Sequence, residues 1–192
     1  MSIGKKKHKT DHYIDDVMHD PKATYFQDYP TTKRTFGFID VCNYTDFTQR
    51  HGVHAAAQML HKFRNAVRIV VGRHGVRVAK WLGDGVMLVG VKPGPVYEAV
   101  ADLNAIFSNQ EFSIHSGISQ GLIIIFEGDD YVGKPVNIAS RLSDHAQPGE
   151  ILSYNISKLE LPLATQMKKF QQGIEIRGVG NLSDIYSLNR KI

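Results

Sequence analysis

The sequence predicts an α+β fold in which helices pack on one face of a mostly antiparallel sheet. Two observations support this prediction. Apolar residues recur at helical spacing in several segments, and short β-rich runs bounded by glycine and polar residues lie between those segments. The chain of 192 residues is long enough for a substantial core, and its 42% hydrophobic and 22% charged residues are typical of a soluble globular protein.

The N-terminal part of the chain differs in character from the rest. Residues 1–34 are polar and contain two prolines, so we expect a partly disordered extension with one short helix around Tyr13 to Met18. Residues 35–192 are predicted to form one domain. Its first strand is expected in RTFGFIDVC. A helix follows, because apolar residues from Val53 to Val70 recur at spacings of three and four before Gly72.

Glycines and prolines mark the boundaries of the remaining elements. GVRVAKWL and VMLVGV are predicted to form a hairpin closed by Gly83-Asp84-Gly85, and a second helix is expected from Pro95 to Phe107. The later segments are the long or bent strand FSIHSGISQGLIIIF, the turn EGDDYVGKP, a helix from Val136 to about Ala146, the strand EILSY and two strands within IEIRGVGNLSDIYSL. This order predicts a ferredoxin-like βαββαβ core with an extra C-terminal helix and strands.

Charge and composition narrow the classes of partner. The net charge is +4, and the basic cluster KKKHK at Lys5 to Lys9 could contact nucleic acid or an anionic membrane. Acidic residues between Asp11 and Asp28 dilute this charge, and aromatic residues do not interleave with it, so no nucleic-acid partner is expected. No apolar run approaches the roughly 18 residues of a membrane span. The single cysteine, Cys42, cannot form an intrachain disulfide, and we expect a cytoplasmic protein.

Two aspartates interrupt the apolar pattern where strands end. Asp40 follows the apolar residues of the first strand, and Asp84 lies at the hairpin tip. If the first strand runs beside the hairpin, the two carboxylates meet at one end of the sheet. Paired carboxylates suit Mg²⁺ or Mn²⁺, with substrate phosphates completing the metal shell. Taken singly, Asp84 is also typical of a turn and Asp40 of a helix cap.

Five further polar residues stand out, and each also has an ordinary structural explanation. Asn137 and Arg141 are spaced i, i+4 at the start of a helix, so they share one face and could form a surface hydrogen bond. Lys80 stands in a strand, where a lysine often protects a sheet edge. Asp130 is typical of a turn in GDDYVG, and Arg177 lies in a glycine-rich turn that could hold a phosphate.

The chain resembles the catalytic domain of the class III nucleotidyl cyclases, the adenylate and guanylate cyclase family, and is most like a bacterial adenylate cyclase. The resemblance rests on FGFIDVCNYTDFT, VAKWLGDGVMLV and SGISQG...GDDYVGKPVNIASRLSDHAQPGEIL, which occur in the family's order from about Thr35 to Leu188. Two features depart from the family pattern. The common Gly-Phe-Thr after the first aspartate is Asn43-Tyr44-Thr45, and GLIIIFEGDDY is shorter and more apolar than the usual hairpin arm.

The resemblance implies how metal and base are bound. Asp40, Asp84 and the carbonyl of Val41 would bind two divalent metal ions per site, either Mg²⁺ or Mn²⁺. Lys80 and Asp130 match the pair that selects the purine. A lysine can donate to adenine N1 and an aspartate can accept from the N6 amino group, so this pair favours ATP over GTP.

The resemblance also implies a reaction and a partner. The 3′-hydroxyl of ATP would attack its own α-phosphate and release pyrophosphate, giving 3′,5′-cyclic AMP. Asn137 and Arg141 match the pair that acts on the ribose and the α-phosphate in the transition state, and Arg177 falls where the family often has a lysine for the terminal phosphates. In this family one site takes residues from two subunits, which implies a homodimer with two active sites at its interface.

Three alternatives remain open from the sequence. An enzyme of the same fold could use GTP or a pyrimidine nucleotide, because Tyr44 is expected near the substrate pocket. A non-catalytic nucleotide-binding or partner-binding domain is opposed by the joint presence of six polar residues, which are Asp40, Lys80, Asp84, Asp130, Asn137 and Arg141. Nucleic-acid binding through the tail would show as strongly salt-dependent binding that is lost on deleting residues 1–10.

Overall fold

The computed structural model describes residues 29–108, 112–170 and 173–190. The chain divides into two units, Met1–Pro30 and Thr31–Ile192, and the described helices and strands all belong to the second. The short helix expected around Tyr13 to Met18 and the basic cluster at Lys5 to Lys9 lie outside the described residues. The first strand begins at Thr31, before residue 35, where the domain is expected to start.

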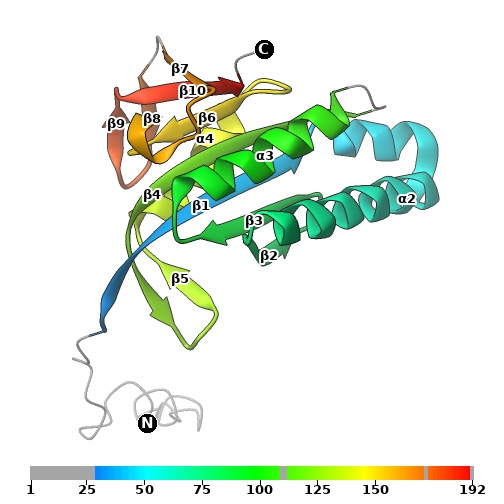
Figure 1. Ribbon diagram of the computed structural model, residues 1–192. Coiled ribbons are helices and arrows are strands. Elements are labelled where there is room, and N and C mark those ends of the chain that lie inside the picture. The colour runs from blue at the N-terminus through cyan, green and yellow to red at the C-terminus, as the bar shows by residue number, and fades with distance from the viewer. Residues whose placement is uncertain (1–28, 109–111, 171–172, 191–192) are drawn as a thin grey trace, which may run out of the picture. The chain divides into compact units, whose positions relative to one another are not determined.

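An eight-stranded sheet and a two-stranded ribbon make up the β-structure (Figure 1). In spatial order the sheet contains β2 (Arg77–Leu82), β3 (Gly85–Gly90), β1 (Thr31–Val41), β4 (Ile114–Phe126), β6 (Ile151–Tyr154), β10 (Ile185–Arg190) and β7 (Thr165–Lys169), with β5 (Asp130–Val132) paired to β4. The ribbon consists of β8 (Ile174–Ile176) and β9 (Gly180–Leu182). Among the described strand pairs, β4 and β6 are parallel and the others antiparallel. The predicted α+β fold on a mostly antiparallel sheet is confirmed.

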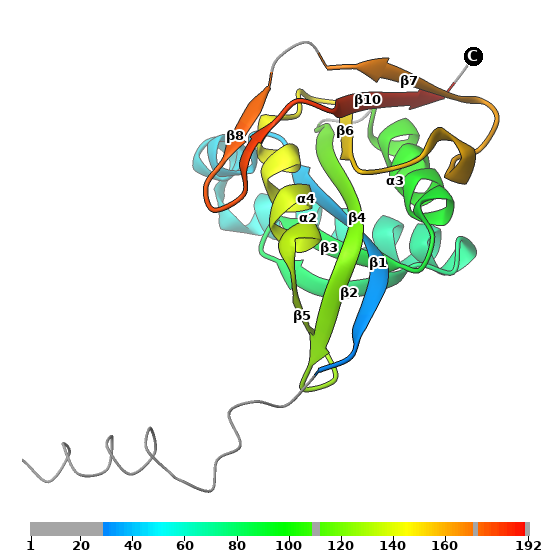
Figure 2. The ribbon, with the colours of Figure 1, turned by 90° about the vertical axis from the view of Figure 1, so that its left-hand side faces the viewer.

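The helices lie on both faces of the sheet (Figure 2). They are α2 (Tyr44–Arg73) and α3 (Pro93–Phe107) on one face and α4 (Lys134–His145) on the other, with the 3₁₀ helix η1 (Lys158–Glu160) after β6. Adjacent residues of β1 show the division. The space beside Gly37 is occupied by Val96 of α3, whereas Phe36 packs in a cluster with Ala139 of α4. The expectation that all helices share one face is therefore wrong. The parallel strands β4 and β6 need a crossover connection, and α4 provides it on the second face.

The largest difference between the predicted and the observed helices is explained by a glycine. α2 begins at Tyr44, and within it Gly52 has a φ of 80° and a ψ of 168°, so a first helical segment precedes the predicted one. Val53, the first residue of the predicted apolar stripe, is 70% exposed, whereas Phe63 and Val67 are fully buried. Ala56 is the first buried residue of the stripe, so the stripe begins to reach the core there rather than at Val53. α3 begins at Pro93, two residues before the predicted start.

Three strands differ from the sequence prediction. The sequence does not predict β5, because it lies within the segment that has turn composition, nor β7, whose residues TQMKK show no regular alternation of apolar side chains. The C-terminal segment holds β8, β9 and β10 rather than two strands. Within the described ranges, every helix is too short or too polar to cross a membrane.

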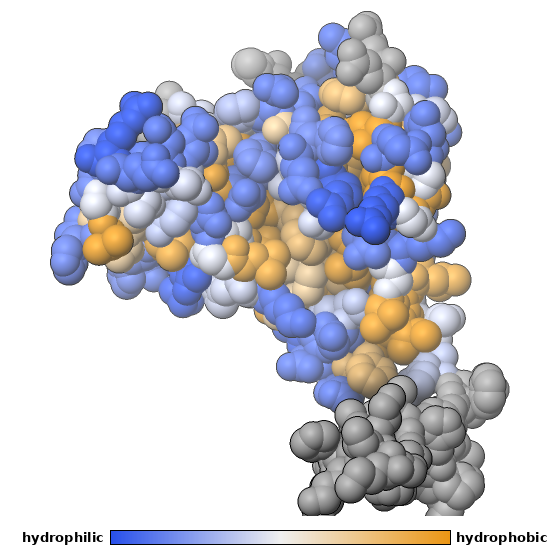
Figure 3. All heavy atoms as spheres, turned by 180° about the vertical axis from the view of Figure 1, so that it is seen from behind, coloured by the Kyte–Doolittle hydropathy of each residue, from blue (hydrophilic) through white to orange (hydrophobic). Residues whose placement is uncertain are grey.

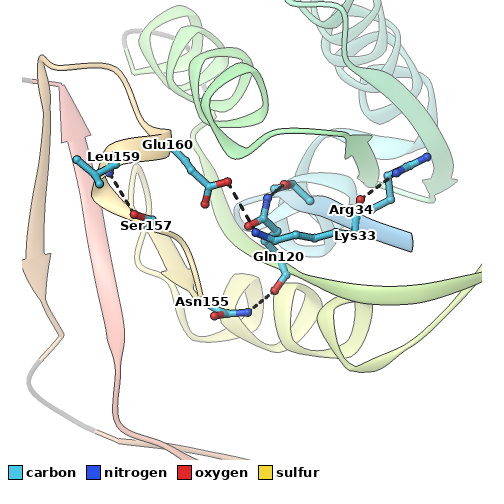
Figure 4. Close-up of polar contacts among 8 residues, drawn as sticks. Lys33, Arg34, Gln120, Asn155, Ser157, Leu159 and Glu160 are labelled. Carbon is cyan, nitrogen blue, oxygen red and sulfur yellow. Dashed lines mark hydrogen bonds and ion pairs between the residues drawn. The ribbon is translucent and has the colours of Figure 1, made fainter. Parts of the chain in front are cut away.

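Polar contacts fasten the segment after β6 to the end of the sheet where β1 begins (Figure 4). Asn155 Nδ2 donates a 2.8 Å hydrogen bond to the carbonyl of Gln120 in β4. Lys33 Nζ of β1 lies 3.8 Å from Glu160 Oε1 of η1. A Cβ added to Gly94 would lie 2.9 Å from the carbonyl oxygen of Glu160, so this segment also packs closely on the start of α3. Asp40 lies near the opposite end of β1, away from these contacts.

Candidate active site

Asp40 and Asp84 lie beside each other at one end of the sheet. β1 pairs with β3 in a register that places Asp40 opposite Gly85, the residue after Asp84, and β4 places His115 on the other side. The packing is tight, because a Cβ added to Gly85 would lie 2.8 Å from Asp40 Oδ1. The strand order thus brings the two carboxylates together, and we call Asp40 and Asp84 the carboxylate pair.

The surroundings of Asp40 are suited to a cation. Burial raises the pKa of the Asp40 carboxyl above its ordinary value, and the negative charge of Asp84 raises it further. His115, whose Nε2 lies 3.9 Å from Asp40 Oδ2, acts in the opposite direction, as does a backbone hydrogen bond at Val41. A divalent cation held between the two carboxylates would offset their repulsion and favour the ionised form of Asp40.

The described residues supply part of a metal shell. Among them, no group of three or more His, Cys, Asp or Glu side chains could hold a metal ion. Two carboxylates and the carbonyl oxygen of Val41 leave positions that substrate phosphates and water can fill, which is the usual arrangement for Mg²⁺. The residues therefore fit Mg²⁺ or Mn²⁺ that binds together with a nucleotide.

We expect the Asp84→Asn variant to have a lower Asp40 pKa than the wild type in the absence of metal, because the repulsion is removed while burial remains. The folded-state pKa of Asp40 lies above its unfolded value of about 3.9, so its contribution to stability is present below that value and is lost as pH rises through the folded pKa. The variant should therefore also have a higher free energy of unfolding at neutral pH. Carbon-13 NMR titration of the Asp40 carboxyl measures the first effect, and Asp144→Asn, whose charge contributes least, should give a smaller decrease. An unchanged pKa in Asp84→Asn would contradict the pairing.

Lys80 and Asp130 form an ion pair between β2 and β5. Lys80 Nζ donates a 2.8 Å hydrogen bond to Asp130 Oδ1, and both side chains are about half exposed. This hydrogen bond, followed by the attraction of opposite charges, raises the pKa of Lys80 and lowers the pKa of Asp130. Both side chains are therefore charged at neutral pH and accessible to a ligand.

A β-bulge determines the direction of Lys80. The pairing of β2 with β3 shifts register between Val78 and Lys80. Val78 and Trp81 pack against the core beneath α2, whereas Ala79 packs in the cluster on the opposite face of the sheet. Regular alternation from Val78 would turn Lys80 toward the face that α2 covers. The extra residue instead lets Lys80 lie on the opposite face, where it contacts Asp130.

Helix α4 presents Asn137 and Arg141 on its exposed side, and close packing fixes this helix on β4. A Cβ added to Gly117 would clash with the carbonyl oxygen of Ala139, so only glycine permits this approach. Arg141 Nη1 donates a 2.9 Å hydrogen bond to Asp144 Oδ2. Among the described residues, neither Asn137 nor Arg141 makes a hydrogen bond or ion pair with the carboxylate pair or with Lys80 and Asp130.

Solved structures share this arrangement of strands and helices. The catalytic core of a rhodopsin-guanylyl cyclase with converted specificity, in complex with ATPαS, superposes with a TM-score of 0.73 at 20% identity, over 86% of this chain and 100% of that chain. The adenylyl cyclase CyaB from P. aeruginosa superposes with a TM-score of 0.72 at 21% identity, over 86% of this chain and 100% of that chain. The chain has the fold of a class III cyclase catalytic domain. The resemblance found in its sequence is thereby confirmed.

Curated proteins are similar to this chain in sequence. The adenylate cyclase of Glutamicibacter nicotianae is 27% identical over 152 residues, which are 78% of this chain and 38% of that protein. An uncharacterized protein of Mycobacterium tuberculosis is 35% identical over 119 residues, which are 61% of this chain and 31% of that protein. The chain thus spans only 31% to 38% of the length of these relatives. No family model matches the sequence.

Asn43 takes the place of a glycine in the cyclase motif, and the backbone explains why it can. Its φ of 57° lies in the left-handed region, which asparagine tolerates better than most other non-glycine residues. Tyr44, the first residue of α2, packs partly against the main core. Asparagine is therefore compatible with the turn after Val41, and part of the Tyr44 side chain is engaged in packing.

Arg177 does not lie with the other candidate residues. It is exposed in the turn between β8 and β9, and its side chain has no hydrogen-bond or ion-pair partner among the described residues. Sequence reasoning also missed His115 and Asp144, whose charges both influence Asp40. The sequence holds no local signal for His115, because only the register between β1 and β4 places it opposite Asp40.

Proposed function

We propose that the chain is the catalytic domain of an adenylate cyclase, which converts ATP to 3′,5′-cyclic AMP and pyrophosphate. The observation that carries the proposal is the 2.8 Å contact between Lys80 and Asp130, because Lys80 lies on the same hairpin as Asp84. Structures of this fold are named for adenylyl and for guanylyl cyclases, so the choice of nucleotide depends on such side chains rather than on the fold.

The Lys80–Asp130 pair matches the hydrogen-bonding edge of adenine. Adenine offers an acceptor at N1 and an amino donor at N6. Lysine can only donate and ionised aspartate can only accept, so the pair can satisfy both positions. Guanine has a carbonyl acceptor at O6 and a donor at N1, the reverse order. The side chains that contact each other in the free protein would exchange this contact for contacts with the base.

The polar residues of the chain can assist the reaction without a covalent intermediate. Two Mg²⁺ or Mn²⁺ ions, when bound, would favour loss of the 3′-hydroxyl proton and neutralise charge on the triphosphate. The carboxylate oxygens of Asp40 and Asp84 would bind these ions. The guanidinium of Arg141 offers several N–H donors to the α-phosphate as negative charge increases there, and Asn137 positions the ribose. Arg177 would bind the terminal phosphates.

Two observations support a homodimer that shares these residues between subunits. Within one chain, Asn137 and Arg141 make no hydrogen bond or ion pair with the carboxylate pair among the described residues, which supports a site completed by a second copy. The face of the sheet turned away from α2 and α3 is hollowed, and apolar side chains gather in the hollow and on the β4–β5 arm below it (Figure 3). On that arm Leu122 is 64% and Val132 is 53% exposed, which is typical of a surface that binds another protein.

The specificity of the Lys80–Asp130 pair tests the proposed substrate. We expect the wild type to prefer ATP over GTP by on the order of 10² in kcat/KM, because a mismatched base leaves buried polar groups unpaired. The double variant Lys80→Glu with Asp130→Cys should erode that preference, since glutamate can accept from guanine N1. kcat/KM with Mn²⁺ is to be measured for ATP, GTP, CTP and UTP, and the cyclic product identified.

A matched control is available in the same domain. Lys169 and Asp184 form another exposed lysine–aspartate pair, with 3.2 Å between Nζ and Oδ1, and Lys169→Glu with Asp184→Cys should leave the ATP preference unchanged. If the wild type prefers another nucleotide, the adenylate assignment is wrong. If it binds ATP without turnover, the domain is a non-catalytic nucleotide-binding module.

A further inference from the structure

The tip of the β2–β3 hairpin is joined to helix α2 by one arginine. Arg64 Nη2 of α2 donates a 2.9 Å hydrogen bond to the carbonyl oxygen of Gly83, the residue before Asp84. Among the hydrogen bonds between described side chains and backbone, this one alone links α2 to the hairpin tip. Arg64 is therefore placed to influence where Asp84 stands.

Trp81 supports the same arginine. The guanidinium carbon of Arg64 lies 5.0 Å from the centroid of the Trp81 ring, within the range of a cation–π contact. Trp81 faces α2 because of the bulge that turns Lys80 to the other face. One strand thus carries the base-reading lysine on one side and the partner of Arg64 on the other.

On its β3 side the hairpin tip is held by the pairing of Gly85 with Asp40 of β1, whereas its β2 side has little besides Arg64 to fix it. β2 is an edge strand, paired to β3 alone among the described strands. Gly83 has a φ of 69°, and no atom lies within 4 Å of a Cβ added there, so the turn itself is open on that side. An exposed edge hairpin with an open turn is free to move unless a side chain holds it.

The environment of Arg64 indicates a task other than stability. Its Nε is buried and has no hydrogen-bond partner among the described residues. A buried donor without a partner disfavours the folded state, and such groups in native proteins call for an explanation. The hydrogen bond from Arg64 to the Gly83 carbonyl explains why an arginine is kept here despite its unpaired Nε.

We propose that Arg64 is a positioning residue for the metal site: its guanidinium, resting on Trp81, holds the Gly83 carbonyl and so keeps the Asp84 carboxylate beside Asp40. This inference rests on the proposed function of Asp40 and Asp84 as metal ligands. Among the described residues, Arg64 makes no hydrogen bond or ion pair with Asp40 or Asp84 and acts through the Gly83 carbonyl. Its removal leaves both carboxylates in place chemically but lets their separation vary, which weakens metal binding more than nucleotide binding.

Arg68 provides a matched control for the test. Its guanidinium carbon also lies over the Trp81 ring, at 5.2 Å from the centroid, but its hydrogen bond goes to Asn65 of its own helix. Arg64→Ala and Arg68→Ala therefore each remove a cation over the same ring, and only the first releases the hairpin tip. Arg64→Lys keeps a cationic hydrogen-bond donor at this position and serves as the conservative variant.

The experiment uses the full chain with two readouts. Trp81 is the only tryptophan of the chain, and paramagnetic Mn²⁺ quenches the fluorescence of a nearby indole, so Mn²⁺ binding can be titrated without turnover. In parallel, the Mn²⁺ concentration at half-maximal activity and the KM for ATP are measured. Thermal unfolding of each variant checks that it is folded.

We expect Arg64→Ala to raise the half-saturating Mn²⁺ concentration about tenfold in both readouts, with the KM for ATP within twofold of wild type. Arg64→Lys should recover most of the loss, and Arg68→Ala should stay within twofold of wild type. An Arg64→Ala variant that behaves as Arg68→Ala does, or a lysine variant no better than alanine, overturns the proposal.

The readouts also separate this inference from the proposed activity. If wild-type protein makes no cyclic nucleotide but Arg64→Ala still weakens Mn²⁺-dependent quenching relative to Arg68→Ala, the positioning role holds and the proposed activity fails. If wild type is active and the two arginine variants have the same Mn²⁺ dependence, the activity holds and the positioning role fails. Absence of both Mn²⁺-dependent quenching and product in wild type overturns both.

Discussion

Asp40→Ala and Asp84→Ala are each expected to lose Mg²⁺- or Mn²⁺-dependent turnover by on the order of 10³-fold or more, while the protein remains folded. Metal ions stabilise the transition state of phosphoryl transfer by several kcal/mol, and about 1.4 kcal/mol corresponds to a tenfold change in rate. Removing one carboxylate of the pair leaves too few protein oxygens to hold the ions, because the described residues offer no third carboxylate, histidine or cysteine to form a metal site.

Folding should survive these substitutions because neither carboxylate supports the core. Asp40 is 45% exposed at its side chain, and Asp84 lies in a turn at the end of an edge hairpin. Removing Asp40 also ends the burial of a carboxylate whose pKa is raised. Circular dichroism and a cyclic-nucleotide assay measure the two properties. Glu175→Ala, which removes an exposed carboxylate of β8, should keep wild-type activity. Activity retained in either aspartate variant would exclude the carboxylate pair as the metal site.

Complementation between two inactive variants is the second large effect expected. Under the proposed function, Asp40→Ala would lack a metal ligand and Arg141→Ala would lack the transition-state donor, so each variant alone should be inactive. If each site takes its metal ligands from one subunit and Arg141 from the other, a mixed dimer has one intact site and one doubly altered site. Random exchange makes half of the dimers mixed, and half of their sites are intact, so recovery of about a quarter of wild-type activity is expected.

The control for complementation comes from the carboxylate pair itself. Mixing Asp40→Ala with Asp84→Ala should restore nothing, because each site of the mixed dimer then lacks one metal ligand. Subunit exchange is verified with differently tagged chains. Sites formed within single chains would give no recovery in the Asp40→Ala and Arg141→Ala mixture despite exchange.

The parts of the fold that follow simple periodicity can be predicted from the sequence. The stripe that includes Phe63 and Val67 predicts the main length of α2, and the apolar runs around Gly83-Asp84-Gly85 predict the β2–β3 hairpin. Both elements depend on which neighbouring side chains are buried, and the spacing of apolar residues along the sequence shows this directly. The meeting of Asp40 with Asp84 also follows, because it requires only that β1 run beside the hairpin.

The rest depends on pairing and packing that no local pattern contains. β5 is three residues long within a turn-like segment, and only its pairing with β4 brings Asp130 to Lys80. The position of α4 on the second face follows from the parallel pairing of β4 with β6, strands separated by that helix. Arg64 carries no signal in the sequence, because an arginine on a helix is ordinarily a solvated charge.

The bulge in β2 means that residue count, as well as residue identity, controls which side chains each face of this sheet presents. Lys80 stands four residues before Asp84, and the spacing between them sets which face each intervening side chain occupies. Upstream of Lys80, the bulge already accommodates one extra residue, Ala79, so a strand shorter by that residue would keep Lys80 and Trp81 on their present faces. One residue inserted between Lys80 and Asp84 would instead exchange the two faces. In this chain, a one-residue insertion there would therefore move Lys80 away from Asp130 without replacing either side chain.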